Sequence, residues 1–309
     1  MFNKKLMAVI TLAMLLITSL GAPVSVQAAG DLNATGKLAA VEKIIYGVAQ
    51  TGAILERVNR LEDDIHGAGS HDAILPRVDK LYEYVYKTTE IAPSLLTKLN
   101  AVEWTLTNSI STNTIKNRIE NLETTINGSS AAGSLDERLD ELMKLAYSAG
   151  EIEVVPAILA KDTLVKIKTL STLNSKKSQV GDSVALGVAE DVYIGGVLIL
   201  PKGASGTGKV VKVRPSRNFG RDAKLEISFD TVKAIDGSTV DVFVGDKAKE
   251  ETKSLAMAAG ASVAGIVILG PIGIIGGAFI SGKDAEIPIG SQLYVQTQED
   301  VEVYGIRVE

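Results

Sequence analysis

A glycine-rich segment from Gly203 to Lys209 has the glycine and lysine spacing of a phosphate-binding loop. In such a loop the backbone amides and the lysine bind phosphate, the next residue is a serine or threonine that binds magnesium, and a helix begins there. Here Val210 follows the lysine, and Val211 to Arg214 alternates apolar and basic residues as a strand does. The pattern therefore predicts a hairpin turn and not a nucleotide site.

The same region is rich in positive charge, with seven basic residues and a single acid, Asp222, between Lys202 and Lys224. These side chains could bind lipid phosphates or an anionic polymer. The alternative, which we favour, is that they form the solvated face and tip of a hairpin. The residues that would make the anionic contact are Lys209, Lys212, Arg214, Arg217 and Arg221.

Residues suited to other chemistry are few. The two histidines, His66 and His71, lie in or beside a predicted linker, where two ligands would hold a metal weakly. The chain has no cysteine, and no acid–base pair is identifiable from spacing. The formal net charge of -5 does not suggest nucleic acid as a partner. The sequence thus predicts a protein that is not an enzyme and has no cofactor or metal.

The longest apolar stretch, Leu255 to Ile280, carries no charged residue from end to end. Gly270 and Pro271 divide it into two legs, each too short to cross a hydrocarbon core of about 30 Å. We therefore expect a glycine-rich helical hairpin over residues 254–282. It would either enter or dock on the outer membrane as an oligomer, or be buried in a water-soluble assembly. The predicted membrane or oligomer contacts are Ala256, Gly260, Ala264, Gly265, Gly270, Pro271, Gly273 and Gly277.

The N-terminus has the parts of a secretory signal peptide over residues 1–28. Lys4 and Lys5 precede an apolar run, and small residues occupy the cleavage positions up to Ala28. The sequence therefore predicts export, with removal of the signal after Ala28.

Residues 29–150 contain a six-fold repeat with a period of about 20 residues. A basic residue marks each repeat. Small or apolar residues recur three positions before this marker and one, four and eight positions after it. This spacing places them on one face of a helix of about 13 residues. Glutamates recur five after four of the markers, and we expect these charges to be solvated helix surface. The markers are Lys37, Arg57, Arg77, Lys98, Arg118 and Arg138, and the glutamates are Glu42, Glu62, Glu103 and Glu123.

Such short helices must pack on neighbours. They could fold back into a compact array, which the glycine and proline breaks favour, or form an end-to-end coiled-coil stalk. The units, such as the one running from Leu55 to Glu62, resemble the leucine-arginine-glutamate helical repeats of secreted proteins from diderm bacteria. The array could contact an envelope protein or a cell-wall partner.

In residues 151–309 the spacing of apolar residues changes from the helical period to a period of two. Leu225, Ile227 and Phe229 alternate with polar residues, as Val211 and Val213 do with basic ones. Turn signals separate these runs, so we expect an antiparallel barrel or sandwich closed by a last strand over residues 301–308. The predicted fold class is α+β, with the helical repeat array first and the apolar hairpin inserted in the β-domain.

The segment from Asp191 to Gly203, together with Gly208 and Asp236-Gly237, resembles the β-domain of the conjugation-type (type IV secretion) outer-membrane scaffold family. The resemblance implies that the apolar stretch corresponds to a pair of helices that enters the outer membrane within an oligomeric ring. From all these patterns we expect a periplasmic, outer-membrane-associated scaffold or tether that contacts lipid and its own copies. The alternative is a subunit of a secretion or conjugation channel complex.

Overall fold

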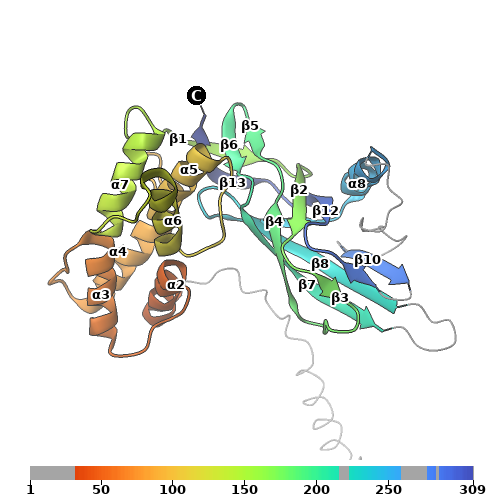
Figure 1. The fold of residues 1–309 in the computed structure, drawn as a ribbon, viewed down its shortest axis with the longest axis horizontal. Coiled ribbons are helices and arrows are strands. Elements are labelled where there is room, and N and C mark those ends of the chain that lie inside the picture. The colour runs from red at the N-terminus through yellow and green to blue at the C-terminus, as the bar shows by residue number, and fades with distance from the viewer. Residues whose placement is uncertain (1–31, 216–222, 259–276, 283–284, 309) are drawn as a thin grey trace, which may run out of the picture.

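The computed structural model describes residues 32–215, 223–258, 277–282 and 285–308. It has an α+β fold, as predicted: a helical array is followed by a mostly antiparallel β-domain (Figure 1). The predicted signal peptide, residues 1–28, lies outside the described residues.

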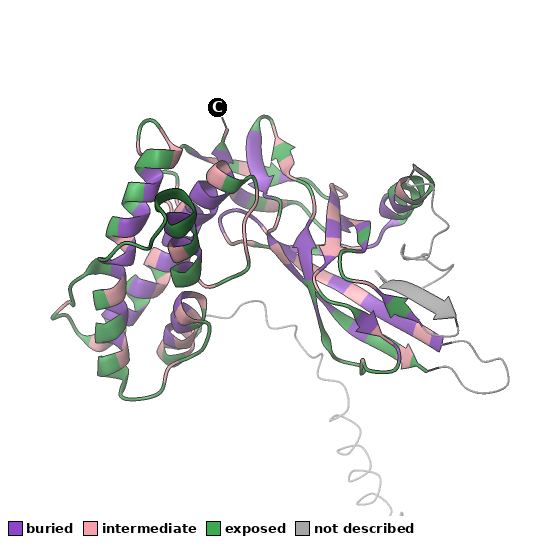
Figure 2. Ribbon diagram, in the orientation of Figure 1, coloured by how far each residue is buried: buried purple, intermediate pink, exposed green. Residues whose placement is uncertain are grey.

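Each predicted repeat is a helix that begins at the apolar residue three positions before its basic marker, so the repeat prediction is confirmed. The apolar stripes are buried, while the opposite faces are exposed (Figure 2). Left-handed residues such as Gly47 and Gly67 end several of the helices, as a C-terminal glycine does. The helices are α2 (Ala34–Tyr46), α3 (Ile54–His66), α4 (Ile74–Tyr86), α5 (Leu95–Thr107), α6 (Ile115–Asn127) and α7 (Leu135–Ala146).

The helices fold back on one another within one chain, so the compact array is the arrangement found. They form two groups of three, in which α2 packs on α4 and α5 packs on α7. Tyr86 donates a hydrogen bond to the carbonyl of Ala40 at 3.0 Å, and Tyr147 donates one to Ala101 at 3.1 Å. The second bond is the counterpart of the first, since Ala101 stands in α5 where Ala40 stands in α2. The array is therefore a tandem pair of three-helix units.

The recurring glutamates and three of the four recurring arginines are buried, and the fourth, Arg57, is 11% exposed, so the prediction that these charges are solvated is wrong. Each arginine binds the glutamate 15 residues before it, as Arg77 does with Glu62 and Arg138 with Glu123, both at 2.6 Å. When the helices fold back, each arginine lies against its glutamate. The ion pair then replaces the contacts with water that both charges lose on burial. We call this set the arginine–glutamate ladder; its pairs are Arg57–Glu42, Arg77–Glu62, Arg118–Glu103 and Arg138–Glu123.

Each ladder glutamate also holds the loop that follows its helix. The carboxylate accepts a hydrogen bond from the backbone N–H eight residues later, for example Glu62 from Ser70 at 2.7 Å and Glu123 from Ala131 at 3.1 Å. One side chain thus joins its own loop to the next helix. The ladder stops at the end of each three-helix unit, where Tyr82 and Met143 occupy the glutamate position.

Six of the described strands close into a barrel in the order β8-β7-β4-β2-β12-β9, with β9 pairing back to β8. Alternate residues fill its core, including the predicted Leu225, Ile227 and Phe229. The strands are β1 (Val154–Leu159), β2 (Leu164–Thr169), β3 (Leu173–Asn174), β4 (Ser183–Val188), β5 (Val192–Ile194), β6 (Val197–Leu200), β7 (Ser205–Arg214), β8 (Ala223–Lys233), β9 (Thr239–Phe243), β10 (Gly277–Gly282), β11 (Glu286–Ile287), β12 (Gln292–Thr297) and β13 (Val301–Arg307).

Two strand predictions need correction. The last strand, β13, does not close the barrel but lies between β1 and β6 in a separate four-stranded sheet, because β9 already joins β8 to β12. Val211 was expected on the core face, yet it is 41% exposed and Val210 is buried. A shift in the β7–β8 register between Val210 and Lys212 reverses the alternation at this point, as a β-bulge does.

Candidate functional site

The apolar stretch begins within a helix that is attached to the barrel. Helix α8 (Asp246–Ala258) packs on β12. The backbone N–H of Ala248 donates to Gln296 Oε1 at 3.1 Å, and Tyr294 N donates to Thr252 Oγ1 at 2.9 Å. Both α8 residues are buried, one turn apart on the same face. The helix therefore has a fixed position from which the apolar sequence continues.

The apolar stretch returns to the barrel as a strand, which corrects part of the predicted hairpin. The second leg was expected to be helical to Ser281, but β10 pairs antiparallel with β8 from Gly277 to Gly282. Strand β10 lies beside β8 on the part of its edge that β9 does not occupy. Gly277 therefore begins a strand and is not on a helix face, while Ala256 lies in α8. Of the predicted contacts, Gly260, Ala264, Gly265, Gly270, Pro271 and Gly273 lie outside the described residues. No helix within the described part of the chain is both long and apolar enough to cross a bilayer.

The basic residues of β7 lie on a hairpin, as the favoured alternative predicted. Lys209 is 3.9 Å from Asp230 and Lys212 is 3.7 Å from Glu226, with exposed lysine side chains. Arg214 ends β7, while Arg217 and Arg221 lie outside the described residues. The segment that resembles a phosphate loop is a turn at residues 202–203 followed by strand β7, so the strand was predicted correctly. The turn is not a hairpin turn, because β6 and β7 lie in different sheets and do not pair.

The histidines lie apart from any cluster of metal-ligating residues among the described positions. His66 Nδ1 is 2.6 Å from Asp136 Oδ2, and the hydroxyl of Tyr84 donates to Asp136 Oδ1 at 2.6 Å. The rings of His66 and Tyr84 meet edge to face. These contacts join α3 and α4 to α7, and so connect the two three-helix units. His71 lies in the loop between α3 and α4.

The helical array meets the β-domain through α5. Trp104 packs against Leu198, Ile235 and Ile306, and its indole N–H donates to Asp191 Oδ1 at 3.0 Å. The amide of Asn100 donates to the carbonyl of Ile235 at 2.7 Å, and the two parts are thus joined by apolar packing and buried polar bonds.

A backbone contact completes this junction. Ile110 N donates to the carbonyl of Lys202 at 2.8 Å, beside Gly203 at φ +90°. A Cβ on Gly203 would overlap the carbonyl oxygen of Ile110, so only glycine allows this approach. We call the contacts of Trp104, Asn100 and Ile110 the junction.

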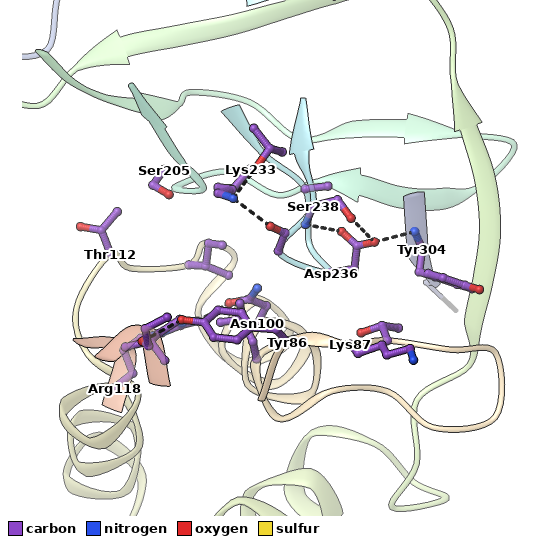
Figure 3. A pocket seen from close by; sticks show the side chains of 18 of the residues that line it. Tyr86, Lys87, Asn100, Thr112, Arg118, Ser205, Lys233, Asp236, Ser238 and Tyr304 are labelled. Atoms are coloured by element: carbon purple, nitrogen blue, oxygen red, sulfur yellow. Dashed lines mark hydrogen bonds between the residues drawn. The ribbon is translucent and has the colours of Figure 1, made fainter. Parts of the chain in front are cut away.

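A pocket of about 800 Å³ opens beside the junction (Figure 3). One wall comes from α2, α4, α5, α6 and the loop before α6, and the other comes from the β-domain. The Lys233 ammonium lies on the β wall, where burial lowers its pKa although the nearby Asp236 charge opposes the shift. The residues that characterise the pocket are Tyr82, Tyr86, Asn100, Ser205, Lys233 and Tyr304.

The sequence contained a signal for the ladder but none for the pocket. The first repeat of each three-helix unit has a lysine (Lys37 or Lys98) in place of the ladder arginine, and the last repeat has Tyr82 or Met143 in place of the glutamate. These are the positions for which the described part of the unit provides no partner helix. That joint departure, with the constant spacing within each pair, points to pairing between successive helices of one three-helix unit. The pocket residues come from segments far apart in the chain, and nothing in their spacing relates them.

The ladder predicts acid sensitivity. Burial alone would raise the pKa of Glu123, but hydrogen bonds from Arg138 and the Ala131 N–H outweigh it and hold the pKa below its usual 4.5. The pKa of Glu62 is lowered against burial in the same way. Because the unfolded chain then binds more protons, the free energy of unfolding should fall as pH drops from about 4.5 through the lower folded values. Urea unfolding at a series of pH values measures this. Glu123→Gln should flatten the profile and the exposed Glu141→Gln should not; equal profiles would contradict the assignment.

Two solved structures show a weak likeness to the chain. No protein-family model and no curated protein matches the chain. ComB10 of the Com type IV secretion system of Helicobacter pylori is similar at 14% identity and a TM-score of 0.26, over 47% of this chain and 89% of that one. A conserved protein of unknown function from Rhodopseudomonas palustris is similar at 11% identity and a TM-score of 0.17, over 49% and 98%.

Proposed function

We propose that the chain is an exported, non-enzymatic scaffold or tether of the cell envelope, which associates with the outer membrane through its apolar stretch. The supporting observation is that this uncharged stretch leaves the barrel through α8 and returns through β10. Burying apolar surface is favourable by about 25 cal/mol per Å², so a segment of this composition needs lipid or protein to cover it. The firm attachment of both ends makes the barrel the part that positions the stretch.

Self-association is part of the proposal. Small residues such as Gly260 and Ala264 stand four apart in the sequence, a spacing that allows close helix contact where water does not drive association. The helical array, joined to the barrel by the junction, would project from the membrane and contact an envelope protein or a cell-wall partner. Its buried ladder favours a rigid arm over a flexible linker.

Vesicle flotation tests the membrane role. The full chain is expected to float with lipid vesicles, and Ile268→Asp should weaken the partition by about a hundredfold, because a carboxylate at the centre of a bilayer costs about 3 kcal/mol. The matched control is Ile91→Asp, since Ile91 lies in the helical array and is 95% exposed. A wild-type chain that remains monomeric in the aqueous fraction would refute the proposal.

The alternative, a subunit of a secretion or conjugation channel, makes a different prediction for the same preparation. Electron microscopy of the detergent-extracted protein should then show closed rings of fixed copy number. A tether needs no such closure, and small or open oligomers would favour it.

A further inference from the structure

The pocket beside the junction contains a positive charge with room for a ligand. Lys233 Nζ donates to Thr239 Oγ1 at 2.6 Å and to the carbonyl of Gly237 at 3.1 Å, and both acceptors are neutral. An ammonium has three N–H groups, so one remains for another acceptor. Among the described residues, no carboxylate forms an ion pair with Lys233. An anionic oxygen in the pocket would satisfy this group and gain from its partial burial.

Four other charged residues line the pocket: Lys87 lies 3.5 Å from Glu83, Glu302 is exposed, and Asp236 and Arg118 are held by contacts within the fold. Asp236 accepts from the backbone N–H and the hydroxyl of Ser238, at 2.9 and 2.8 Å, and from Tyr304 N at 2.8 Å. Arg118 is neutralised by Glu103 in the ladder. Asp236 keeps its charge, but its oxygens are occupied by these donors, whereas the Lys233 ammonium has an N–H group left with which to bind an anionic oxygen.

Groups that could bind hydroxyls lie at the same end of the pocket. Figure 3 shows Ser205 and Thr112 near Lys233, on opposite walls. Within the described chain, the hydroxyls of these two residues and the side-chain amide of Asn113 have no hydrogen-bond partner. Three polar groups that line one pocket and have no partner within the fold suit a ligand that carries several hydroxyls.

The helical wall adds aromatic surface. Tyr82 and Tyr86 line the pocket with ring centroids 5.0 Å apart. Tyr82 occupies a position where four other repeats have the ladder glutamate, so the repeat itself does not require it. Ring faces of this kind cover the apolar C–H face of a sugar ring. The volume of about 800 Å³ lies within the usual range for ligand sites and suits one or two sugar rings.

We propose that this pocket binds an acidic saccharide, whose carboxylate is bound by Lys233. The sugar hydroxyls bind Ser205, Thr112 and Asn113, and the ring packs on Tyr82 and Tyr86. This site is separate from the membrane role proposed above, so either proposal can fail alone.

The test compares two sugars that differ in the carboxylate. Isothermal titration of the full chain, in a polyoxyethylene detergent free of sugar groups, is expected to show binding of N-acetylmuramic acid at least about tenfold tighter than N-acetylglucosamine, which is the effect of one charge-assisted hydrogen bond. Absence of binding by both sugars, or equal binding of the two, would overturn the proposal. Inorganic phosphate that binds as tightly as the acidic sugar would also overturn it, since a plain anion site would then suffice.

Variants locate the site. Lys233→Met should weaken binding of N-acetylmuramic acid at least about tenfold, while Lys161→Met, at an exposed lysine on the β1–β2 loop, should leave it unchanged. Unchanged binding in Lys233→Met would refute the assignment. If that variant does not fold, as judged by circular dichroism, the double variant Ser205→Ala/Thr112→Val replaces it, because these hydroxyls make no bond within the described fold. The double variant should weaken both sugars, and an unaltered affinity in it would likewise refute the site.

Discussion

The substitution Arg138→Met is expected to lower the free energy of unfolding of the helical array by about 3–5 kcal/mol, the usual cost of removing one partner of a buried ion pair. Arg138 binds Glu123 through Nε at 2.9 Å and Nη2 at 2.6 Å, and the side chains are only 7% and 3% exposed. Methionine fills similar space but leaves the carboxylate buried with one backbone donor, Ala131 N–H. The loss therefore arises from an unpaired charge more than from lost packing.

Urea unfolding followed by far-ultraviolet circular dichroism measures the effect. The matched control is Lys144→Met in the same helix, since Lys144 pairs with Glu141 at the surface, and no measurable change is expected. The double variant Arg138→Met/Glu123→Met should recover part of the loss because no buried charge remains. If Arg138→Met were as mild as Lys144→Met, the ladder would not stabilise the array.

The helices could be predicted from the sequence because their signal is local. A stripe such as Leu38, Val41 and Ile45 lies on one helix face whatever the tertiary fold, and each repeat shows the same stripe again. Whether the charged side chains are buried or solvated could not be predicted from such a local pattern. Arg77 and Glu62 look like surface residues in their own helices, and they become buried only when α3 and α4 fold against each other.

The β-domain, too, could be predicted only where the signal is local. Alternation along β8 predicted its buried face, since neighbouring strands do not change the period. Closure of the barrel depends on β9 pairing with β12, which is distant in the chain, and no spacing rule supplies that partner. The bulge at Val210 also depends on the facing strand, and so the predicted orientation of Val211 was wrong.

The apolar stretch was identified from composition, but its second leg was assigned the wrong structure. Gly277 continued a helical spacing of small residues, and nothing in the sequence indicated that β8 has a free edge at Ser228. An unpaired strand edge attracts a strand, because its backbone donors and acceptors need partners. The pairing therefore overrides the helical pattern.

Gly203→Ala is expected to separate the helical array from the β-domain, at a cost of about 2–5 kcal/mol. Alanine at φ +90° costs about 1–2 kcal/mol, and its Cβ would overlap the carbonyl of Ile110, which forces a shift costing about 1–3 kcal/mol. The hydrogen bond from Ile110 N to Lys202 should break as the two segments move apart. This glycine faces a backbone that cannot move without moving the junction.

Trp104 reports the outcome because it is the sole tryptophan of the chain and lies in the junction at 9% exposure. In Gly203→Ala its fluorescence should shift to the red and become accessible to iodide, while the circular dichroism of the helices remains. The control is Gly195→Ala, where φ is +58° and a Cβ would meet nothing within 4 Å, so it carries the left-handed strain alone. That variant should lose about 1–2 kcal/mol of stability with unchanged fluorescence. Equal fluorescence in the two variants would show that the junction does not depend on Gly203, because backbone strain is common to both and only the overlap with Ile110 distinguishes them.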